Sequence, residues 1–254
     1  MTTFSANLGY LFTDRPLPEA IRAAKACGFD AVECHFPYDV PPAEVIAALE
    51  ETGLPMISLN TRLGDRAAGE VGLCALPGRE DDARDAITQA VTYAAEVGAG
   101  AIHVVAGVIE GEAAHRTFVE NLRFATAQAA SHGLTILLEP LNRFDTPGYF
   151  LWTTDQAIAI MDELAVPNIK LMFDFYHVER TEGDAIARLE HLLPRVGHIQ
   201  FAGVPDRGQP ETSTLDYAEV FRAVDRLGWT GPLGAEYRPD GKTEDSLGWM
   251  RDFR

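Results

Sequence analysis

Four oxygen-bearing side chains stand where short apolar runs end in the second half of the chain. They are Glu139 after TILL, Asp174 after IKLMF, Gln200 in VGHIQFAG and Glu236 in PLGAEY. Roughly 25 to 36 residues separate successive members, which is about the length of one strand-plus-helix unit. Three carboxylates that converged in one pocket would repel one another unless a cation paired with them. Because all four candidate ligands are oxygens, the set predicts a Mg²⁺ or Mn²⁺ site.

The elements that must position these residues follow from the alternation of apolar and amphipathic runs. Strand-like runs alternate with helical patterns along the whole chain. The expected strands cover residues 5–12, 31–36, 56–60, 101–106, 135–139, 169–174, 196–202 and 233–237. A helix is expected after each strand, the last over residues 246–253. Such alternation implies parallel strands joined by right-handed crossovers.

Eight strand–helix units in 254 residues favour an α/β fold of the closed (β/α)8 TIM barrel type, with a single domain over residues 1–254. No GxGxxG follows the first strand, so the usual mark of a dinucleotide-binding fold is absent. In such a barrel the active site lies at the C-terminal ends of the strands, where the four oxygen ligands are expected. The glycine-containing stretch over residues 61–78 has the length of a lid over that mouth.

Composition and charge narrow the class of function. The chain has 46% hydrophobic residues and a net charge of −17. Phosphates repel so acidic a protein, which argues against nucleic acid and anionic membrane surfaces as partners. Cys27, Cys34 and Cys74 form no CxxC pair, and the sequence has neither a leader-like segment nor an apolar stretch of about 18 residues. We expect a cytoplasmic protein that acts on a small molecule.

Several sequence blocks resemble a known enzyme family. They include ENLRFA, LLEPLNRFDTPGYFL, FDFYHVER, GHIQFAGVPDRGQP and AEYRP. In combination these blocks resemble the hydroxypyruvate isomerase family, with its 2-oxo-tetronate isomerase-like members, within the xylose-isomerase-like TIM barrel superfamily. The resemblance runs over essentially the whole chain, from residue 4 to residue 254. It implies a metal-dependent aldose–ketose isomerase.

The resemblance also assigns residues. The metal ligands of the family fall on Glu139, Asp174, Gln200 and Glu236. Its two proton-transferring acids fall on Glu139 and Glu236, and positions that resemble substrate-binding residues fall on His177 and Arg207. The epimerase relatives carry His where this chain has Gln200, so the amide favours the isomerase branch. The implied substrate is a small acidic hydroxy-carbonyl compound: hydroxypyruvate, giving tartronate semialdehyde, or 2-oxo-tetronate, giving 3-oxo-tetronate.

The chemistry of such an isomerase calls for two acids. Moving a carbonyl to the next carbon needs a base that removes a proton and an acid that returns it. A divalent metal can polarise the substrate oxygens and stabilise the enediolate between these steps. Glu139 and Glu236, at the ends of the expected fifth and eighth strands, could face each other across the mouth. The order in which they act and the length of the substrate stay open.

Three further polar residues are weaker candidates for substrate contacts. Asn7 and His103 belong to the expected first and fourth strands, and Arg238 lies two residues beyond Glu236. His103 is more simply explained as a hydrogen-bonded histidine of the barrel wall. Arg238 is more simply explained as a solvent-exposed charge.

Other functions stay open at this point. A ketose 3-epimerase of the tagatose or psicose type would use the same proton chemistry, and a lyase of the inosose-dehydratase type could use the same metal and base. An apurinic endonuclease shares the barrel but would need more histidine ligands and a basic face. A catalytically inactive small-molecule-binding barrel is the non-enzyme alternative, and the presence of all four ligands weighs against it. The oligomeric state is open too, and includes a homo-oligomer.

Overall fold

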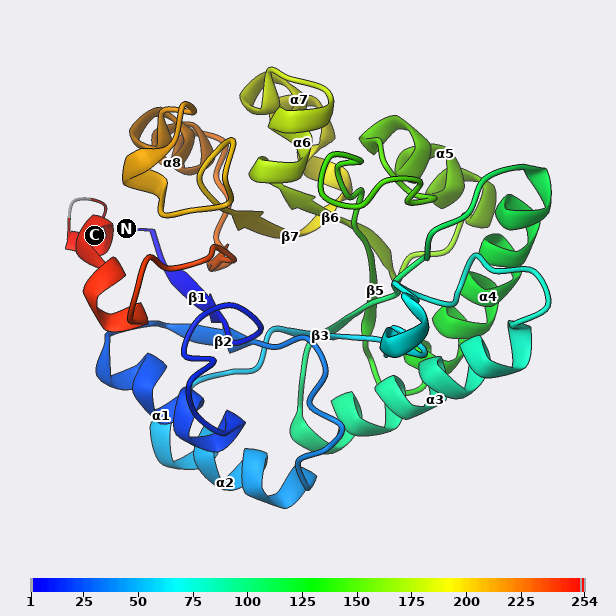
Figure 1. Cartoon of the computed structure of the whole chain (residues 1–254), viewed down its shortest axis with the longest axis horizontal. Helices are drawn as coiled ribbons and strands as arrows, with labels where there is room; N and C mark the ends of the chain where they lie inside the picture. The colour runs from blue at the N-terminus through cyan, green and yellow to red at the C-terminus, as the bar shows by residue number, and fades with distance from the viewer. Residues whose placement is uncertain (1, 252, 254) are drawn as a thin grey trace.

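The computed structural model describes residues 2–251 and Phe253, and its eight strands form one sheet that curls into a barrel. All neighbouring strands run parallel, in the order β2-β1-β8-β7-β6-β5-β4-β3. The strands are β1 Phe4–Asn7, β2 Ala31–Glu33, β3 Ser58–Asn60, β4 Ala101–His103, β5 Thr135–Leu138, β6 Ile169–Asp174, β7 Val196–Phe201 and β8 Leu233–Ala235. The two ends of this order meet through backbone bonds, such as that from the Cys34 amide to the Ser58 carbonyl at 3.1 Å. The expected TIM barrel is thus confirmed (Figure 1).

Among the described residues, eight α-helices form an outer layer around the barrel (Figure 1). They are α1 Leu17–Ala26, α2 Pro42–Thr52, α3 Glu80–Val97, α4 Glu112–Ala130, α5 Thr154–Leu164, α6 Phe175–Thr181, α7 Ala185–Leu192 and α8 Tyr217–Arg226. Local signals set their ends: α2 begins with Pro42, which suits a first helical turn, and stops at Gly53, which adopts a left-handed φ of 68°. None of the described helices combines the length and the apolar character needed to span a bilayer.

Three predicted strand ends are wrong for a local reason. The first strand ends at Asn7 rather than at residue 12. The side-chain oxygen of Asn7 accepts the amide of Gly9, and its carbonyl accepts the amide of Leu11, so the chain turns out of the sheet while the run is still apolar. The second and fourth strands likewise end at Glu33 and His103 rather than at residues 36 and 106. An apolar run therefore marks a buried segment better than it marks where a strand stops.

Helix placement differs from expectation in one crossover and in the C-terminal segment. Between β6 and β7 the chain forms two helices, α6 and α7, where one was expected. In place of the helix expected over 246–253 there are two short 3-10 segments, η4 Thr243–Ser246 and η5 Gly248–Arg251; residue 252 lies outside the described part. Trp249 of η5 is fully buried and meets Phe4 of β1 edge-on, with ring centroids 4.9 Å apart. This contact holds the C-terminal segment against the first strand.

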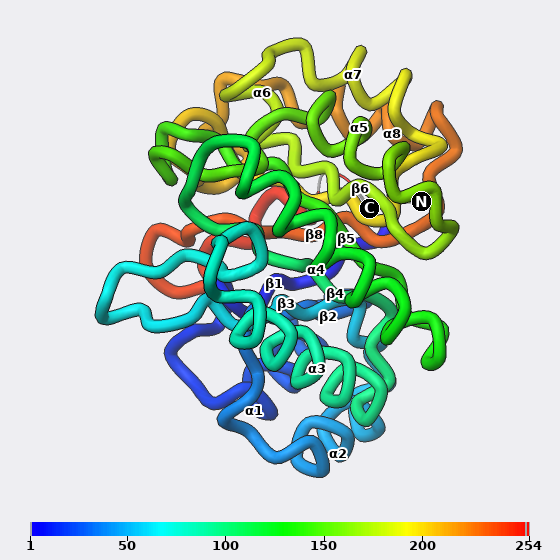
Figure 2. The backbone as a smooth tube through the Cα atoms, turned by 90° about the vertical axis from the view of Figure 1, so that its right-hand side faces the viewer, coloured from blue at the N-terminus to red at the C-terminus, as the bar shows by residue number. Residues whose placement is uncertain are grey.

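The long stretch over residues 61–78 projects from the body on the side away from the two chain termini (Figure 2). Its tip carries a short 3-10 segment, η1 Arg66–Ala68. Its base is fixed, because Leu73 and Cys74 are buried and Gly72 lies against the backbone of Gly107, which follows β4. The role of this stretch as a lid stays a prediction.

Candidate active site

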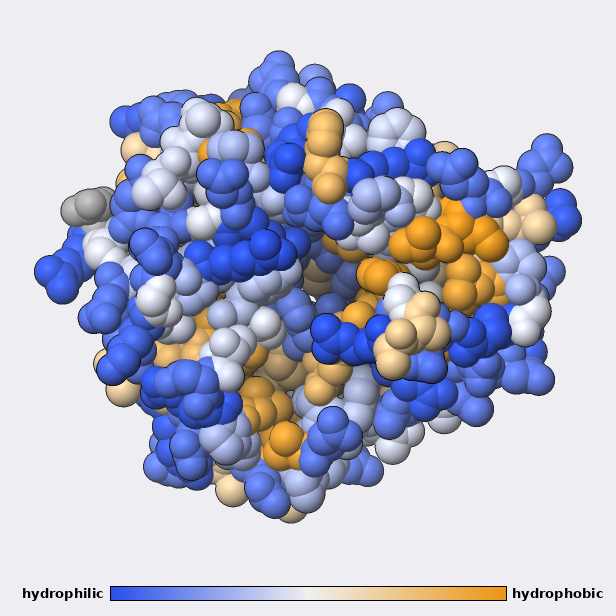
Figure 3. All heavy atoms as spheres, in the orientation of Figure 1, coloured by the Kyte–Doolittle hydropathy of each residue, from blue (hydrophilic) through white to orange (hydrophobic). Residues whose placement is uncertain are grey.

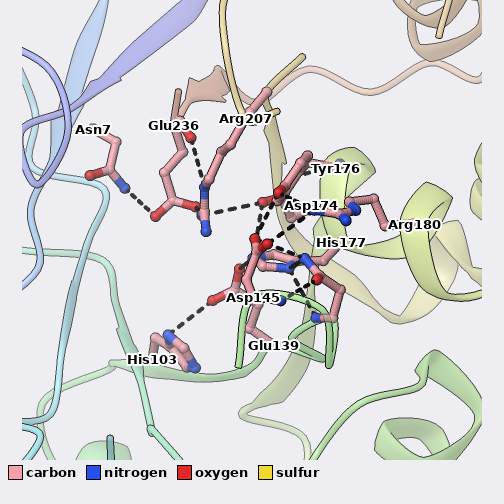
Figure 4. A network of polar contacts seen from close by, with 12 residues as sticks. Asn7, His103, Glu139, Asp145, Asp174, Tyr176, His177, Arg180, Arg207 and Glu236 are labelled. Atoms are coloured by element: carbon pink, nitrogen blue, oxygen red, sulfur yellow. Dashed lines mark hydrogen bonds and ion pairs between the residues drawn. The ribbon is translucent and has the colours of Figure 1, made fainter. Parts of the chain in front are cut away.

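The C-terminal ends of β5, β6 and β8 bring several buried side chains to one point (Figure 4). Ligand atoms within 4.8 Å of one another come from Glu139, Asp174, His177 and Glu236. Strand register places Gln200, the residue that carries the fourth predicted oxygen, next to Asp174 on the neighbouring strand β7 and opposite Gly234 on β8. The molecule is hollowed at the centre of the barrel, and both hydrophilic and hydrophobic residues surround the hollow (Figure 3).

The cluster offers the ligand set of a hard cation. Oε1 of Glu139, Oδ2 of Asp174 and Oε1 of Gln200 are buried and have no hydrogen-bond donor among the described residues. Buried oxygens are rarely left without a partner in folded proteins. Carboxylate and amide oxygens are the ligands that Mg²⁺ and Mn²⁺ prefer. The residues present therefore fit such an ion, and the cluster could bind a metal.

His177 is the histidine of the cluster, and one of its ring nitrogens faces the carboxylates. Its Nδ1 accepts the backbone amide of Asn142 at 3.0 Å. Burial, together with the positive charge of Arg207, lowers the pKa of His177 well below its usual value, so the ring is neutral. Its single hydrogen must then sit on Nε2. That nitrogen lies 3.8 Å from Oε1 of Glu139 and 3.7 Å from Oδ2 of Asp174.

Among the carboxylates of the cluster, Glu236 has the most hydrogen-bond donors around its side chain. Its Oε1 accepts from Nδ2 of Asn7 at 2.9 Å and lies 2.8 Å from Nε2 of His35. Its Oε2 forms an ion pair with Nη2 of Arg207. Burial alone would raise the pKa of Glu236, but Arg207 and His35 outweigh it, so the pKa lies below the ordinary value. Glu236 is therefore ionised at neutral pH.

Arg207 supplies positive charge inside the cluster. It is buried, with its guanidinium 4.6 Å from the ring centroid of Tyr10 and 5.2 Å from that of Tyr176. Its Nη2 also lies 3.8 Å from Oδ2 of Asp174, so one nitrogen serves two carboxylates. The aromatic faces hold the guanidinium where it offsets part of the negative charge.

Glu139 and Asp174 lack comparable support. Burial, then the nearby charges of Glu236 and Asp174, raise the pKa of Glu139 well above its usual value. Burial and Glu236 raise the pKa of Asp174 to about 7. His103 has its Nδ1 3.2 Å from Oε2 of Glu139 but outside hydrogen-bond geometry, and burial lowers the pKa of His103 to about 4. Without a cation, Glu139 therefore releases its proton less readily than an ordinary glutamate does, and Asp174 is only partly ionised at neutral pH.

Below the cluster, a second buried polar pair lies inside the barrel. Nε2 of His198 lies 2.5 Å from Oε2 of Glu33, and both side chains are buried. A Cβ at Gly234 would lie 2.3 Å from Glu33 and 2.8 Å from Cγ of Gln200. The glycine on β8 thus makes room for this pair directly under the predicted amide ligand.

Most of the predicted site residues converge, and one does not. Close to the cluster lie Asn7, His103, Glu139, Asp174, His177, Gln200, Arg207 and Glu236. Arg238 lies apart: its side chain is exposed and its guanidinium is 5.9 Å from the ring centroid of Tyr10. Sequence reasoning missed His35, because the expected second strand ran on to residue 36. The available signal was the histidine that opens HFPYDV, two residues after the observed end of β2.

Comparison with known proteins assigns the chain to a family. Residues 21–253 match the family model described as xylose isomerase-like TIM barrel. The chain is 43% identical to the 2-oxo-tetronate isomerase of Cupriavidus necator, over 100% of this chain and 99% of that protein. It is 36% identical to the hydroxypyruvate isomerase of Escherichia coli, over 100% of both.

Two solved structures share the fold over nearly the whole chain. A crystal structure described as AP endonuclease, family 2, from Brucella melitensis has a TM-score of 0.95 at 36% identity, with full coverage of both chains. The 3-keto-D-glucoside 4-epimerase of Escherichia coli has a TM-score of 0.83 at 24% identity over 99% of both chains, which supports the fold alone. The chain is therefore an isomerase, and it belongs to the xylose isomerase-like TIM barrel family.

Proposed function

We propose that this isomerase acts on a small hydroxy-oxo acid, hydroxypyruvate or 2-oxo-tetronate, and moves its carbonyl group between adjacent carbons. The two isomerase relatives suggest the substrate class, because each matches the whole chain. The observation that carries the proposal is the buried cluster at the barrel mouth, in which three acids offer oxygens within 4.8 Å of one another. Burying this many ionisable groups costs desolvation free energy. Such clusters are typical of catalytic sites.

The proposed ion is Mg²⁺ or Mn²⁺. The residues that would hold it are Glu139, Asp174, Gln200 and Glu236. When bound, such an ion would polarise the substrate carbonyl and stabilise negative charge on the substrate oxygens. His177 carries its hydrogen on the nitrogen that faces the cluster, so we assign it as a donor to a substrate oxygen. Arg207, the buried cation beside Glu236, is assigned to the substrate carboxylate or hydroxyl groups.

The two glutamates divide the proton transfers. One carboxylate takes the proton from the carbon beside the carbonyl, and the electrons of that C–H bond form the carbon–carbon double bond of the enediolate. The other acid gives a proton to the former carbonyl carbon, and the hydroxyl proton passes between the two substrate oxygens. Proton exchange with water then restores the starting protonation of both glutamates. Glu236, which Arg207 and His35 keep ionised, can accept the first proton, and Glu139 then has the role of the donor. Reversal of the substrate direction reverses these roles.

The test of this proposal measures proton exchange. Purified protein is treated with EDTA, supplied with Mg²⁺ or Mn²⁺, and incubated with hydroxypyruvate or 2-oxo-tetronate in deuterated water. We expect deuterium in the product, seen by NMR, only when metal is present. Glu139→Gln and Glu236→Gln should each lower the rate by roughly 10²- to 10⁴-fold, because each removes a proton-transferring group.

The matched control is Glu110→Gln, the same substitution on a carboxylate that is 68% exposed. It should retain the wild-type rate. Metal binding without exchange on either oxo acid would contradict the proposed function. A wild-type rate in either active-site glutamine variant would contradict the assignment of two acids.

A further inference from the structure

His35, which follows β2, is a direct neighbour of Glu236 that has no part in the proposed proton transfer. Its Nε2 lies 2.8 Å from Oε1 of Glu236, and its side chain is 21% exposed. Because an ionised carboxylate only accepts hydrogen bonds, Nε2 must carry the hydrogen. Asn7 donates to the same oxygen at 2.9 Å. Oε1 therefore has two donors, one from the end of β1 and one from the end of β2.

The two oxygens of Glu236 face different surroundings. Oε2 pairs with Nη2 of Arg207, the atom that also lies 3.8 Å from Oδ2 of Asp174. Oε2 thus lies on the side of the other cluster acids, and Oε1 on the side of His35. The energy barrier to rotation about the terminal bond of a glutamate is low, so a carboxylate without such neighbours would rotate about that bond. With both lone pairs of Oε1 in hydrogen bonds, Oε2 is the oxygen with bonding capacity left for the site.

Gly9 determines where both donors to Oε1 lie. Its amide donates to Oδ1 of Asn7 at 2.9 Å, which leaves the Nδ2 of that residue to face Glu236. A Cβ at Gly9 would lie 2.2 Å from Nδ1 and 2.4 Å from Cγ of His35, so the imidazole rests directly on the glycine backbone. The φ of Gly9 is not left-handed, so the missing side chain serves the ring and not a turn. The ring of Tyr10 meets the imidazole edge-on, with centroids 5.4 Å apart.

We propose that His35 is a positioning residue for Glu236: its Nε2–H, together with Asn7, anchors Oε1 and thereby directs Oε2 toward the metal ligands and the substrate. This inference rests on the proposed function of Glu236 as ligand and proton-transferring acid. His35 itself neither takes nor gives the proton. Its effect is to hold the plane of the carboxylate at one angle about its terminal bond.

A matched set of substitutions separates hydrogen bonding from packing. His35→Gln places an amide NH₂ as many bonds from Cα as the original Nε2, whereas His35→Asn reaches only as far as Nδ1. His35→Phe keeps a ring and removes the donor. Loss of a hydrogen bond that orients a metal ligand typically lowers metal affinity or activity by roughly 10- to 100-fold. We expect that loss in kcat and in Mn²⁺ affinity for the Phe and Asn variants, with KM within about threefold and with rescue by Gln.

Gly9→Ala tests the same contact without changing the histidine. The new methyl group would displace the ring, so this variant should lose Mn²⁺ affinity and kcat to the same extent as His35→Phe. The ¹⁵N spectrum of the imidazole in metal-loaded protein should show a hydrogen on Nε2 of His35, and Gly9→Ala should shift that signal. Gly248→Ala is the control, because a Cβ there meets only an ordinary contact at 3.4 Å from Glu211.

Two measurements keep this inference separate from the proposed function. Mn²⁺ affinity from titration calorimetry needs no turnover, so it decides the role of His35 even if neither oxo acid is a substrate. Wild-type Mn²⁺ affinity and kcat in His35→Phe would overturn the inference and leave the function intact. Equal loss in the Gln and Asn variants would show that only the packing of the ring matters, and would overturn it as well.

Discussion

At the scale of single residues, the cluster is a set of charges that its protein neighbours only partly neutralise. Burial and the charge of Glu236 raise the pKa of Asp174 from 3.8 to about 7. In metal-free protein the folded state therefore keeps a proton that the unfolded chain releases at lower pH. A raised carboxyl pKa stabilises the folded state fully below the unfolded pKa, and this contribution disappears as the pH rises through the folded pKa.

We predict the consequence for metal-free protein between pH 4 and pH 7. The free energy of unfolding of the wild type, measured by urea titration in EDTA, should fall relative to that of Asp174→Asn by a few kcal/mol as the pH rises across this window. The comparison with the variant matters because His103, whose pKa is lowered to about 4, acts in the opposite direction in both proteins. Mn²⁺ at about 100 times its Kd should return about 2.7 kcal/mol to the wild type at pH 7. Parallel pH curves for the two proteins would show that Asp174 is ionised throughout.

At the scale of elements, two glycines decide how the stretch over residues 61–78 joins the barrel. Gly72 and Gly107 have left-handed φ values of 109° and 118°. A Cβ on Gly72 would lie 2.8 Å from the nitrogen of Gly107, and a Cβ on Gly107 would lie 2.7 Å from the oxygen of Gly72. The loop base and the segment after β4 thus pack backbone against backbone. This contact fixes the base while the tip around η1 stays exposed.

A pair of alanine variants isolates that close approach. Gly69→Ala also lies at a left-handed φ, of 80°, but nothing lies within 4 Å of its Cβ, so it should lose only about 1 kcal/mol of stability. Gly72→Ala meets the same backbone strain and a backbone clash, and should lose about 3 kcal/mol or more. Thermal unfolding and limited proteolysis of the loop measure both effects. Equal losses in the two variants would mean that the loop base moves away from Gly107 without penalty.

At the scale of the whole molecule, the C-terminal segment completes the barrel wall against its first strand. The indole of Trp249 is fully buried, meets the rings of Phe4 and Phe201 edge-on at 4.9 and 5.3 Å, and donates to the hydroxyl of Tyr237 at 3.1 Å. These partners belong to β1, β7 and the chain just after β8. A short 3-10 segment thus fills the place that a helix was expected to take.

Trp249→Ala should therefore lower the stability of the whole barrel and not only that of the C-terminal segment. We expect a loss of about 3 to 5 kcal/mol in the free energy of unfolding, because removal of a large buried side chain leaves a cavity. Trp152→Ala is the control, since that indole is 38% exposed, and its effect should be well under half as large. Chemical denaturation followed by circular dichroism gives both values. A small effect at Trp249 would show that the C-terminal segment is dispensable for the barrel.

The sequence by itself determined the eight-unit barrel and the convergence of Glu139, Asp174, Gln200 and Glu236. Both follow from periodic information, because alternating apolar runs specify parallel strands and the last polar residue of each run must lie at the same mouth. The sequence also pointed to His177 and Arg207 near that mouth, through their resemblance to family positions. It misplaced strand ends, because a buried turn is as apolar as a buried strand.

Only the tertiary structure decided which charges face each other. His35 meets Glu236, about 200 residues away in the chain, because β2 and β8 both adjoin β1 in the barrel and the bare backbone of Gly9 admits the imidazole between them. Likewise, the asymmetry between Glu236, with three donors, and Glu139, whose Oε1 has none, depends on side-chain packing. Local sequence patterns specify which residues reach the mouth, whereas distance and burial set the proton affinity of each.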